Sequence, residues 1–225
     1  MNKSAFIFCL VIIALSCSKD VPYTLVYNTN YFGVIQGRYA IYNVQEMSHD
    51  VNLIPKHDTN TYQLKTVIGN EYIDNKNRKG YEFLRYVFDT IYQQWTLKDT
   101  WVIYHDNTNG ELVEENQRII KLTFPIRTEK EWNSNTFNNE PEKKYFYSNI
   151  HKPRTIGSLN FDSTLQVKQQ YFKSLIDFQN QYEYYATNVG LISKVYKNLI
   201  IDNFDTLIIQ KGNEIHYQII EYGFE

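Results

Sequence analysis

Alternation of apolar and polar side chains with a period of two constrains this chain's fold more than any other feature. The pattern runs through three separate segments, residues 62–68, 118–124 and 159–167. Because successive side chains of a β-strand point to opposite faces, this period predicts strands with one buried face. Residues 81–92 (YEFLRYVFDTIY) are apolar on both faces, which is typical of a central strand covered on two sides.

Turn signals separate these segments. Asn109-Gly110, Asn188-Val189-Gly190 and Gly212-Asn213 each lie between two apolar runs, and residues 75–80 form a polar loop before the 81–92 strand. Asn and Gly tolerate the positive φ that tight hairpin turns require. We therefore predict roughly ten antiparallel strands with short connections.

The predicted fold class is all-β, with at most one or two short helices. We expect a single antiparallel, strongly curved sheet, a half-barrel or an open barrel-like form, because a sheet of about ten sequential strands curls, splits or closes. A closed barrel and a sandwich stay open as alternatives. Residues 168–179 (KQQYFKSLIDFQ) fit a helix, a strand or a loop. Residues 31–225 are expected to form one β-rich domain without an internal linker.

The N-terminus has the features of an export signal. Lys3 precedes Ala5 to Leu15, eleven residues without a polar side chain. A helix of this length is too short for a hydrocarbon core about 30 Å thick at about 1.5 Å per residue, but it matches the apolar centre of a secretory signal. Residues 1–16 are predicted to be a signal peptide and residues 17–30 a tether.

The tetrapeptide Ala14-Leu15-Ser16-Cys17 resembles the lipobox of bacterial lipoproteins. The resemblance implies a diacylglycerol on the sulfur of Cys17, further acylation such as palmitate, and attachment to a membrane through these acyl chains. The only other cysteine, Cys9, lies in the discarded segment, so no disulfide forms within the mature chain. Ser18 after the cysteine implies the outer membrane, with the periplasmic or surface face open. An ordinary secreted protein and a short N-terminal anchor are the alternatives.

The rest of the chain resembles a family of uncharacterised, β-rich cell-envelope lipoproteins of Bacteroidota-type bacteria. The resemblance rests on packing and turn residues, in segments that together cover nearly the whole mature chain: 31–44, 62–68, 115–126, 132–135, 159–167 and 184–196. It implies a β-rich, lipid-anchored domain and assigns no catalytic residue.

No catalytic, cofactor or metal site is predicted from the sequence. The nearest approach to a metal cluster is His49 and His57, which flank a polar loop and are expected to be exposed loop residues. Residues 105–116 lack the acidic residues that a calcium loop needs at its first and last positions, so they predict a hairpin turn. Ser158 lacks the surrounding glycines of a nucleophile elbow.

Three carboxylates are the least improbable centre for a hydrolase of unknown class. Glu111, Glu114 and Glu115 follow one another closely. Glycosidases need two carboxylates about 5–10 Å apart across a cleft, whereas Glu114 and Glu115 are expected on opposite faces of a strand. We therefore interpret them as a solvated strand end.

Two features point to binding. The chain holds 20 tyrosines, which suit protein and glycan surfaces and equally suit pairing across strands. Arg85 lies mid-strand among apolar residues, where it pairs with a core carboxylate or lines a cavity. The net charge of −2 gives no basic surface for nucleic acid.

These observations favour a non-catalytic, lipid-anchored protein of the cell envelope that acts as a binding or scaffolding module. Its partner is the membrane and a protein, glycan or lipid ligand. The first alternative is a carrier that holds an apolar ligand or lipid in the concave face of a half-barrel. The second is the hydrolase.

Overall fold

The computed structural model describes residues 26–225, which form twelve strands and one 3₁₀-helix. None of the helical turns in this range is long and apolar enough to cross a bilayer. In chain order the elements are η2 (Thr29–Phe32), β1 (Arg38–Asp50), β2 (His57–Ile73), β3 (Lys79–Asp89), β4 (Gln94–His105), β5 (Asn109–Glu114), β6 (Gln117–Thr123), β7 (Glu131–Asn133), β8 (Lys144–Ile156), β9 (Leu159–Lys173), β10 (Asp177–Ala186), β11 (Gly190–Asp202) and β12 (Asp205–Phe224).

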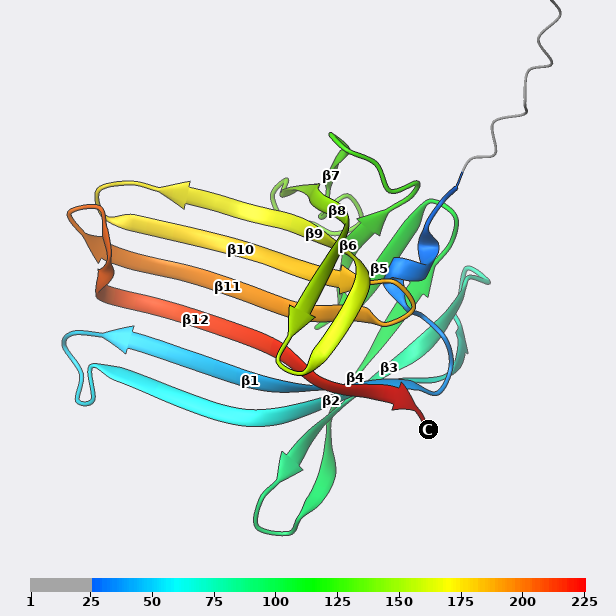
Figure 1. The fold of residues 1–225 in the computed structure, drawn as a ribbon, viewed down its shortest axis with the longest axis horizontal. Helices are drawn as coiled ribbons and strands as arrows, with labels where there is room; N and C mark the ends of the chain where they lie inside the picture. Colours follow the sequence, from blue (N-terminus) through cyan, green and yellow to red (C-terminus); the bar gives the residue numbers. More distant parts are fainter. Residues whose placement is uncertain (1–25) are drawn as a thin grey trace, which may run out of the picture.

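All twelve strands belong to one antiparallel sheet that follows the order of the chain (Figure 1). Strands β1–β6 form one meander and β7–β12 a second, and the pairing of β1 with β12 joins them. Every neighbour is therefore sequential except at this junction, and the two edges of the sheet are β6 and β7. The predicted all-β fold with a single, strongly curved antiparallel sheet is confirmed.

The two edges approach each other across a seam. Ile120 N donates a hydrogen bond to Ser134 O at 2.9 Å, and Trp132 Nε1 donates to Ile120 O at 3.1 Å. The Tyr147 hydroxyl donates to Thr123 O at 2.7 Å. These bonds bring the sheet nearly into a closed barrel at the end that holds β5–β8. The long strands β1, β2 and β9–β12 extend away from that end (Figure 1).

The period-two pattern decides burial in the first part of the 62–68 segment of β2. Leu64 and Thr66 are buried, whereas Gln63 and Lys65 are partly exposed; from Thr66 to Ile68 both faces are covered, because Val67 is buried as well. The alternation is lost in β6, where residues 120–123 are all buried. This strand contacts both the barrel interior and the residues across the seam, so both of its faces are covered.

The Asn109-Gly110 hairpin is present, but its turn lies earlier than the dipeptide predicts. Asp106 begins the turn, and its Oδ1 accepts hydrogen bonds from the backbone N–H groups of Thr108 and Asn109 at 2.6 and 2.8 Å. Gly110 is already in β5, opposite His105. A Cβ at Gly110 would lie 2.7 Å from Phe32 Cδ1, so the glycine makes room for the helix η2.

The predicted turn at Gly212-Asn213 is wrong, because both residues lie inside the long strand β12. The turn is instead at Asn203 and Phe204, whose φ values of 48° and 61° are those of a tight hairpin. A Cβ at Gly212 would lie 2.2 Å from Asn198 O, so this glycine permits close approach of β11. The turn predicted at residues 188–190 is confirmed.

Residues 168–179 form the end of β9, a turn and the start of β10. Of the three alternatives for this segment, the helix is therefore wrong. Ser174 closes the turn, since its Oγ accepts a hydrogen bond from Asp177 N at 2.9 Å. Tyr171 and Phe178 pack edge to face across the hairpin, 6.3 Å between ring centroids. The apolar spacing that also fits a helix therefore serves cross-strand contact.

Helix η2 fills much of the barrel end. Tyr31 is fully buried, and its hydroxyl lies 2.7 Å from His151 Nδ1 and 2.6 Å from Ser163 Oγ. Phe32 packs into the same apolar cluster as Leu122, Leu165 and other inward side chains. The segment just before η2 is also fixed, because Tyr27 O accepts a hydrogen bond from Ile126 N at 3.3 Å.

We expect Gly110→Ala to destabilise the fold by about 1–3 kcal/mol, because the added methyl group overlaps the Phe32 ring. Phe32→Ala in the same chain removes the ring atoms that the methyl group overlaps, so the double variant should lose less stability than the sum of the single variants. Urea denaturation of all four proteins measures this coupling. Additive losses would contradict the contact.

Candidate functional site

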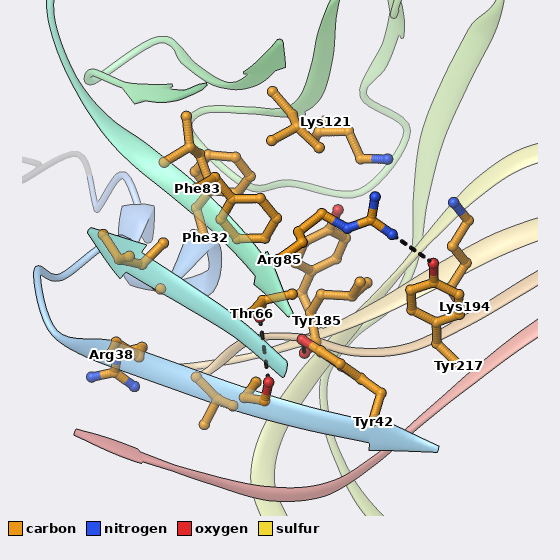
Figure 2. A pocket seen from close by; sticks show the side chains of 18 of the residues that line it. Phe32, Arg38, Tyr42, Thr66, Phe83, Arg85, Lys121, Tyr185, Lys194 and Tyr217 are labelled. Atoms are coloured by element: carbon orange, nitrogen blue, oxygen red, sulfur yellow. Dashed lines mark hydrogen bonds between the residues drawn. The ribbon is translucent and has the colours of Figure 1, made fainter. Parts of the chain in front are cut away.

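A cavity of about 110 Å³ lies between η2 and the inner wall of the barrel (Figure 2). Strands from both meanders contribute to it, so it depends on the junction of β1 and β12. It is lined by Phe32, Gly33, Arg38, Tyr39, Ala40, Tyr42, Leu64, Thr66, Ile68, Phe83, Arg85, Trp101, Ile103, Leu112, Glu114, Lys121, Glu183, Tyr185, Val189, Gly190, Leu191, Lys194 and Tyr217.

One side of the cavity is apolar. Phe32 from η2 faces Ile68, Ile103 and Leu112, which point inward from β2, β4 and β5. Phe83 of β3 completes this side and stacks on Trp101 with 6.4 Å between ring centroids. These side chains come from alternate strand positions, which is how the period-two pattern builds an apolar wall.

Arg85 gives the cavity a cationic wall. Its Nη1 donates to Asp99 Oδ2 at 2.7 Å, and its Nη2 donates to the Tyr217 hydroxyl at 3.3 Å. The guanidinium carbon lies 3.9 Å from the Trp101 ring centroid, a cation–π contact. Both alternatives considered for this arginine are therefore realised, because it pairs with a carboxylate and also lines the cavity.

Lys121 and Glu183 form a buried ion pair beside Arg85. Lys121 Nζ lies 2.6 Å from Glu183 Oε1, and the Tyr185 hydroxyl donates to Oε2 at 2.7 Å. Burial alone would raise the pKa of Glu183, but Lys121 and Lys194 outweigh it and lower the pKa to about 2. The pair therefore stabilises the fold above the ordinary glutamate pKa, and this contribution is lost as the pH falls toward 2.

Lys194 of β11 is the third cation of the wall. Among the described residues it makes no hydrogen bond and no ion pair; its Nζ lies 5.5 Å from the Tyr217 ring centroid. Burial lowers the pKa of Lys194, and the positive charge of Lys121 lowers it further. An ammonium group in this position gains more from an anion than a solvated lysine does.

A polar groove continues from the cavity toward solvent, with a volume of about 510 Å³. It shares Glu114, Lys121, Glu183 and Lys194 with the cavity. Lys143 stands in the groove, where its Nζ donates to Gln181 Oε1 at 2.7 Å. The remaining lining combines amide and aromatic side chains with two further carboxylates: Ile119, Asn135, Glu140, Pro141, Glu142, Tyr145, Gln169, Gln170, Gln179 and Tyr196.

The expectation that His49 and His57 are exposed loop residues is wrong about the loop, since both are strand residues; His57 is exposed as expected, whereas the His49 side chain is largely buried. They lie in β1 and β2, opposite each other, with 2.8 Å between their Nδ1 atoms. Both histidines lie at the strand ends next to the β1–β2 loop, since β1 ends at Asp50 and β2 begins at His57. The His49 Nε2 atom lies 3.3 Å from Glu214 Oε1. No group of three or more His, Cys, Asp and Glu side chains able to hold a metal occurs among residues 26–225.

The three glutamates of the hydrolase alternative are separated by the fold. Glu111 is buried, and both of its carboxylate oxygens accept hydrogen bonds from Arg118, at 2.6 and 2.9 Å. Glu114 lines the cavity, and Glu115 lies in the β5–β6 turn with a φ of 47°. Glu111 is therefore not the solvated residue that its neighbours in sequence suggest. Ser158 lies in the β8–β9 turn.

Sequence reasoning missed Lys121, Glu183 and Lys194. Lys121 alternates with apolar neighbours and was expected on a polar face, but the seam buries both faces of β6. Glu183 stands between two tyrosines in QYEYYA, as Arg85 stands among apolar residues. A charged residue inside an aromatic strand was therefore the signal that would have found it. Cys17, the predicted lipid attachment site, lies outside the described residues.

Comparisons with known proteins add little. No family model matches the chain, and no curated protein does. Among solved structures, it is similar to a crystal structure described as that of a "putative lipoprotein" from Parabacteroides distasonis ATCC 8503, with a TM-score of 0.39 and 12% identity over 89% of this chain and 100% of that one. A likeness this distant carries no argument about the site.

We expect Lys121→Met to destabilise the protein by about 3–5 kcal/mol, because Glu183 is left as an unpaired buried charge. Lys121→Met combined with Glu183→Gln should recover at least half of that loss, since the charge is then gone. Chemical denaturation measures both variants. A double variant as unstable as the single one would contradict a dominant role for the charge.

Proposed function

We propose that this protein is a non-catalytic, lipid-anchored binding protein of the cell envelope, and that it holds the apolar part of a small ligand in the barrel cavity. The observation that carries the proposal is the cavity itself, with an apolar side built by Phe32, Phe83 and Leu112 and a polar groove leading out. Ligand sites are typically concave and mostly apolar, with a few polar groups that fix orientation.

The size of the cavity favours a small group over a long acyl chain. A protein cavity of about 150 Å³ holds benzene, and this one is about 110 Å³. Tyr31 and Phe32 already occupy much of the space that a carrier of long lipids would leave empty. If the protein is a carrier, the part of the ligand that lies in the cavity therefore has roughly four to six carbons.

The lipid anchor is proposed from the sequence around Cys17. Nine residues lie between Cys17 and Tyr27, which among the described residues is the first one hydrogen-bonded to the barrel, and the ten residue-to-residue steps span at most about 35 Å. An acylated Cys17 would hold the barrel end that contains η2 near the bilayer. Two or more acyl chains are needed for stable attachment, because one chain binds only marginally.

Labelling cells with a palmitate analogue tests the anchor. We expect wild-type protein and Cys9→Ala to carry the label and to sediment with membranes, and Cys17→Ala to lose both properties. Cys9→Ala is the matched control, because it removes the other cysteine. Label retained in Cys17→Ala would contradict the proposed attachment site.

Hexan-1-ol tests the cavity, because its six carbons suit the apolar side and it carries no charge. We expect the alcohol to shift the NMR signals of cavity residues in the wild type. In Leu112→Phe the added ring fills the space, so binding should weaken by about tenfold or more. Leu207→Phe is the control, since Leu207 is 89% exposed. No shifts in the wild type would overturn the proposed binding function.

A further inference from the structure

Three cations from three separate strands point into the same space where the cavity meets the polar groove. They are Arg85 of β3, Lys121 of β6 and Lys194 of β11 (Figure 2). Lys121 and Lys194 line both the cavity and the groove, so this space is the passage between them. The Tyr217 hydroxyl stands beside it as the acceptor of the Arg85 hydrogen bond.

The cations around this passage differ in how they are paired. Arg85 pairs with Asp99, and Lys121 pairs with Glu183. Lys143 is bonded to a neutral amide and shares the groove with the exposed residues Glu140 and Glu142. Glu114 lines both the cavity and the groove. Lys194 makes no hydrogen bond or ion pair with the described residues, so its ammonium group has no bonded carboxylate.

An unpaired ammonium in a partly desolvated passage is costly, and an anion removes that cost. The burial that lowers the pKa of Lys194 supports this conclusion, since it measures how poorly the surroundings solvate the charge. The guanidinium of Arg85 and the hydroxyl of Tyr217 add donors on the same side. An anion here would lie at the mouth of the apolar cavity.

We propose that the ligand is an amphipathic anion, with a small apolar group in the cavity and a carboxylate or phosphate in the passage beside Lys194. This rests on the proposed binding function and adds the class of ligand to it. Lys194 and the Tyr217 hydroxyl contact the anionic oxygens. Lys121 remains paired with Glu183 and contributes through its field. The polar groove accommodates whatever continues beyond the anionic group.

Three probes with the same six-carbon chain test the inference by calorimetry or NMR titration: hexanoate, hexyl phosphate and hexan-1-ol. We expect the wild type to bind at least one of the two anions about tenfold or more tightly than the alcohol, since hydrogen bonds to charged groups strengthen binding. Whichever anion binds more tightly identifies the head group. Acetate, which has the charge without the chain, should bind far more weakly.

Lys194→Met provides the decisive comparison, because no carboxylate is bonded to this lysine and none is left unpaired. We expect the variant to bind the anions no more tightly than hexan-1-ol, and a circular dichroism spectrum like that of the wild type to show that it is folded. Lys194→Arg should keep the preference. Lys173→Met is the matched control, because Lys173 is an exposed lysine of β9.

Equal affinity of wild-type protein for the alcohol and both anions would overturn the assignment of an anion and leave the proposed binding function intact. So would a preference for anions that persists in Lys194→Met. Failure of all three probes to bind would overturn the proposed function as well.

Discussion

Pairing of β1 with β12 is the interaction on which the rest of the structure depends. The two strands run side by side from Arg38 opposite Phe224 to Asp50 opposite Lys211, with one irregularity in register between Ile41 and Tyr42. On one side the chain continues through β2–β6, and on the other through β11–β7. The cavity draws Leu64, Phe83 and Leu112 from the first meander and Glu183, Tyr185 and Lys194 from the second. Without this pairing there would be no shared interior, and the site would not exist.

Charge inside the barrel follows from the same arrangement. Lys121 and Glu183 are 62 residues apart in sequence and come from different meanders, yet they meet as a buried pair. A buried pair is weak evidence for stability, because the cost of desolvation offsets the attraction. Burial, a specific partner and a cavity together are more often found at functional sites than in ordinary cores. The pair therefore sits beside Lys194 and Arg85 as part of a charged wall.

The sheet could be predicted from the sequence because side-chain alternation and turn residues are local features of the chain. Alternation in residues 62–68 and the turn at residues 188–190 depend only on neighbours in the chain. The two glycines that misled the turn prediction, Gly110 and Gly212, are required by distant contacts, with Phe32 and with Asn198. Local turn chemistry does not distinguish a glycine that bends the chain from one that admits a neighbour.

The site was harder to predict because its charged residues are brought together by contacts between distant parts of the chain. Arg85 stood out because its immediate neighbours are apolar, whereas Lys121 occupies a position that alternation assigns to solvent. Lys121 is instead buried and pairs with Glu183 of β10, and no local pattern announces that contact. The lack of a bonded carboxylate at Lys194 becomes evident only once Glu183 is known to pair with Lys121. Charge balance around a cavity is a property of the assembled barrel.

Helix η2 connects the proposed anchor to the proposed ligand site. Phe32 forms part of the apolar side of the cavity, Tyr31 is fixed by His151 and Ser163, and Tyr27 is bonded to Ile126. A chain attached at Cys17 would therefore keep the cavity within a few tens of ångströms of the bilayer, since the intervening residues span at most about 35 Å. Amphipathic anions concentrate at such an interface, because their apolar part leaves water while their charge stays solvated. Under the proposed function, the anchor, the small apolar cavity and the cation at its mouth would be three parts of one arrangement for capturing that class of molecule near a membrane.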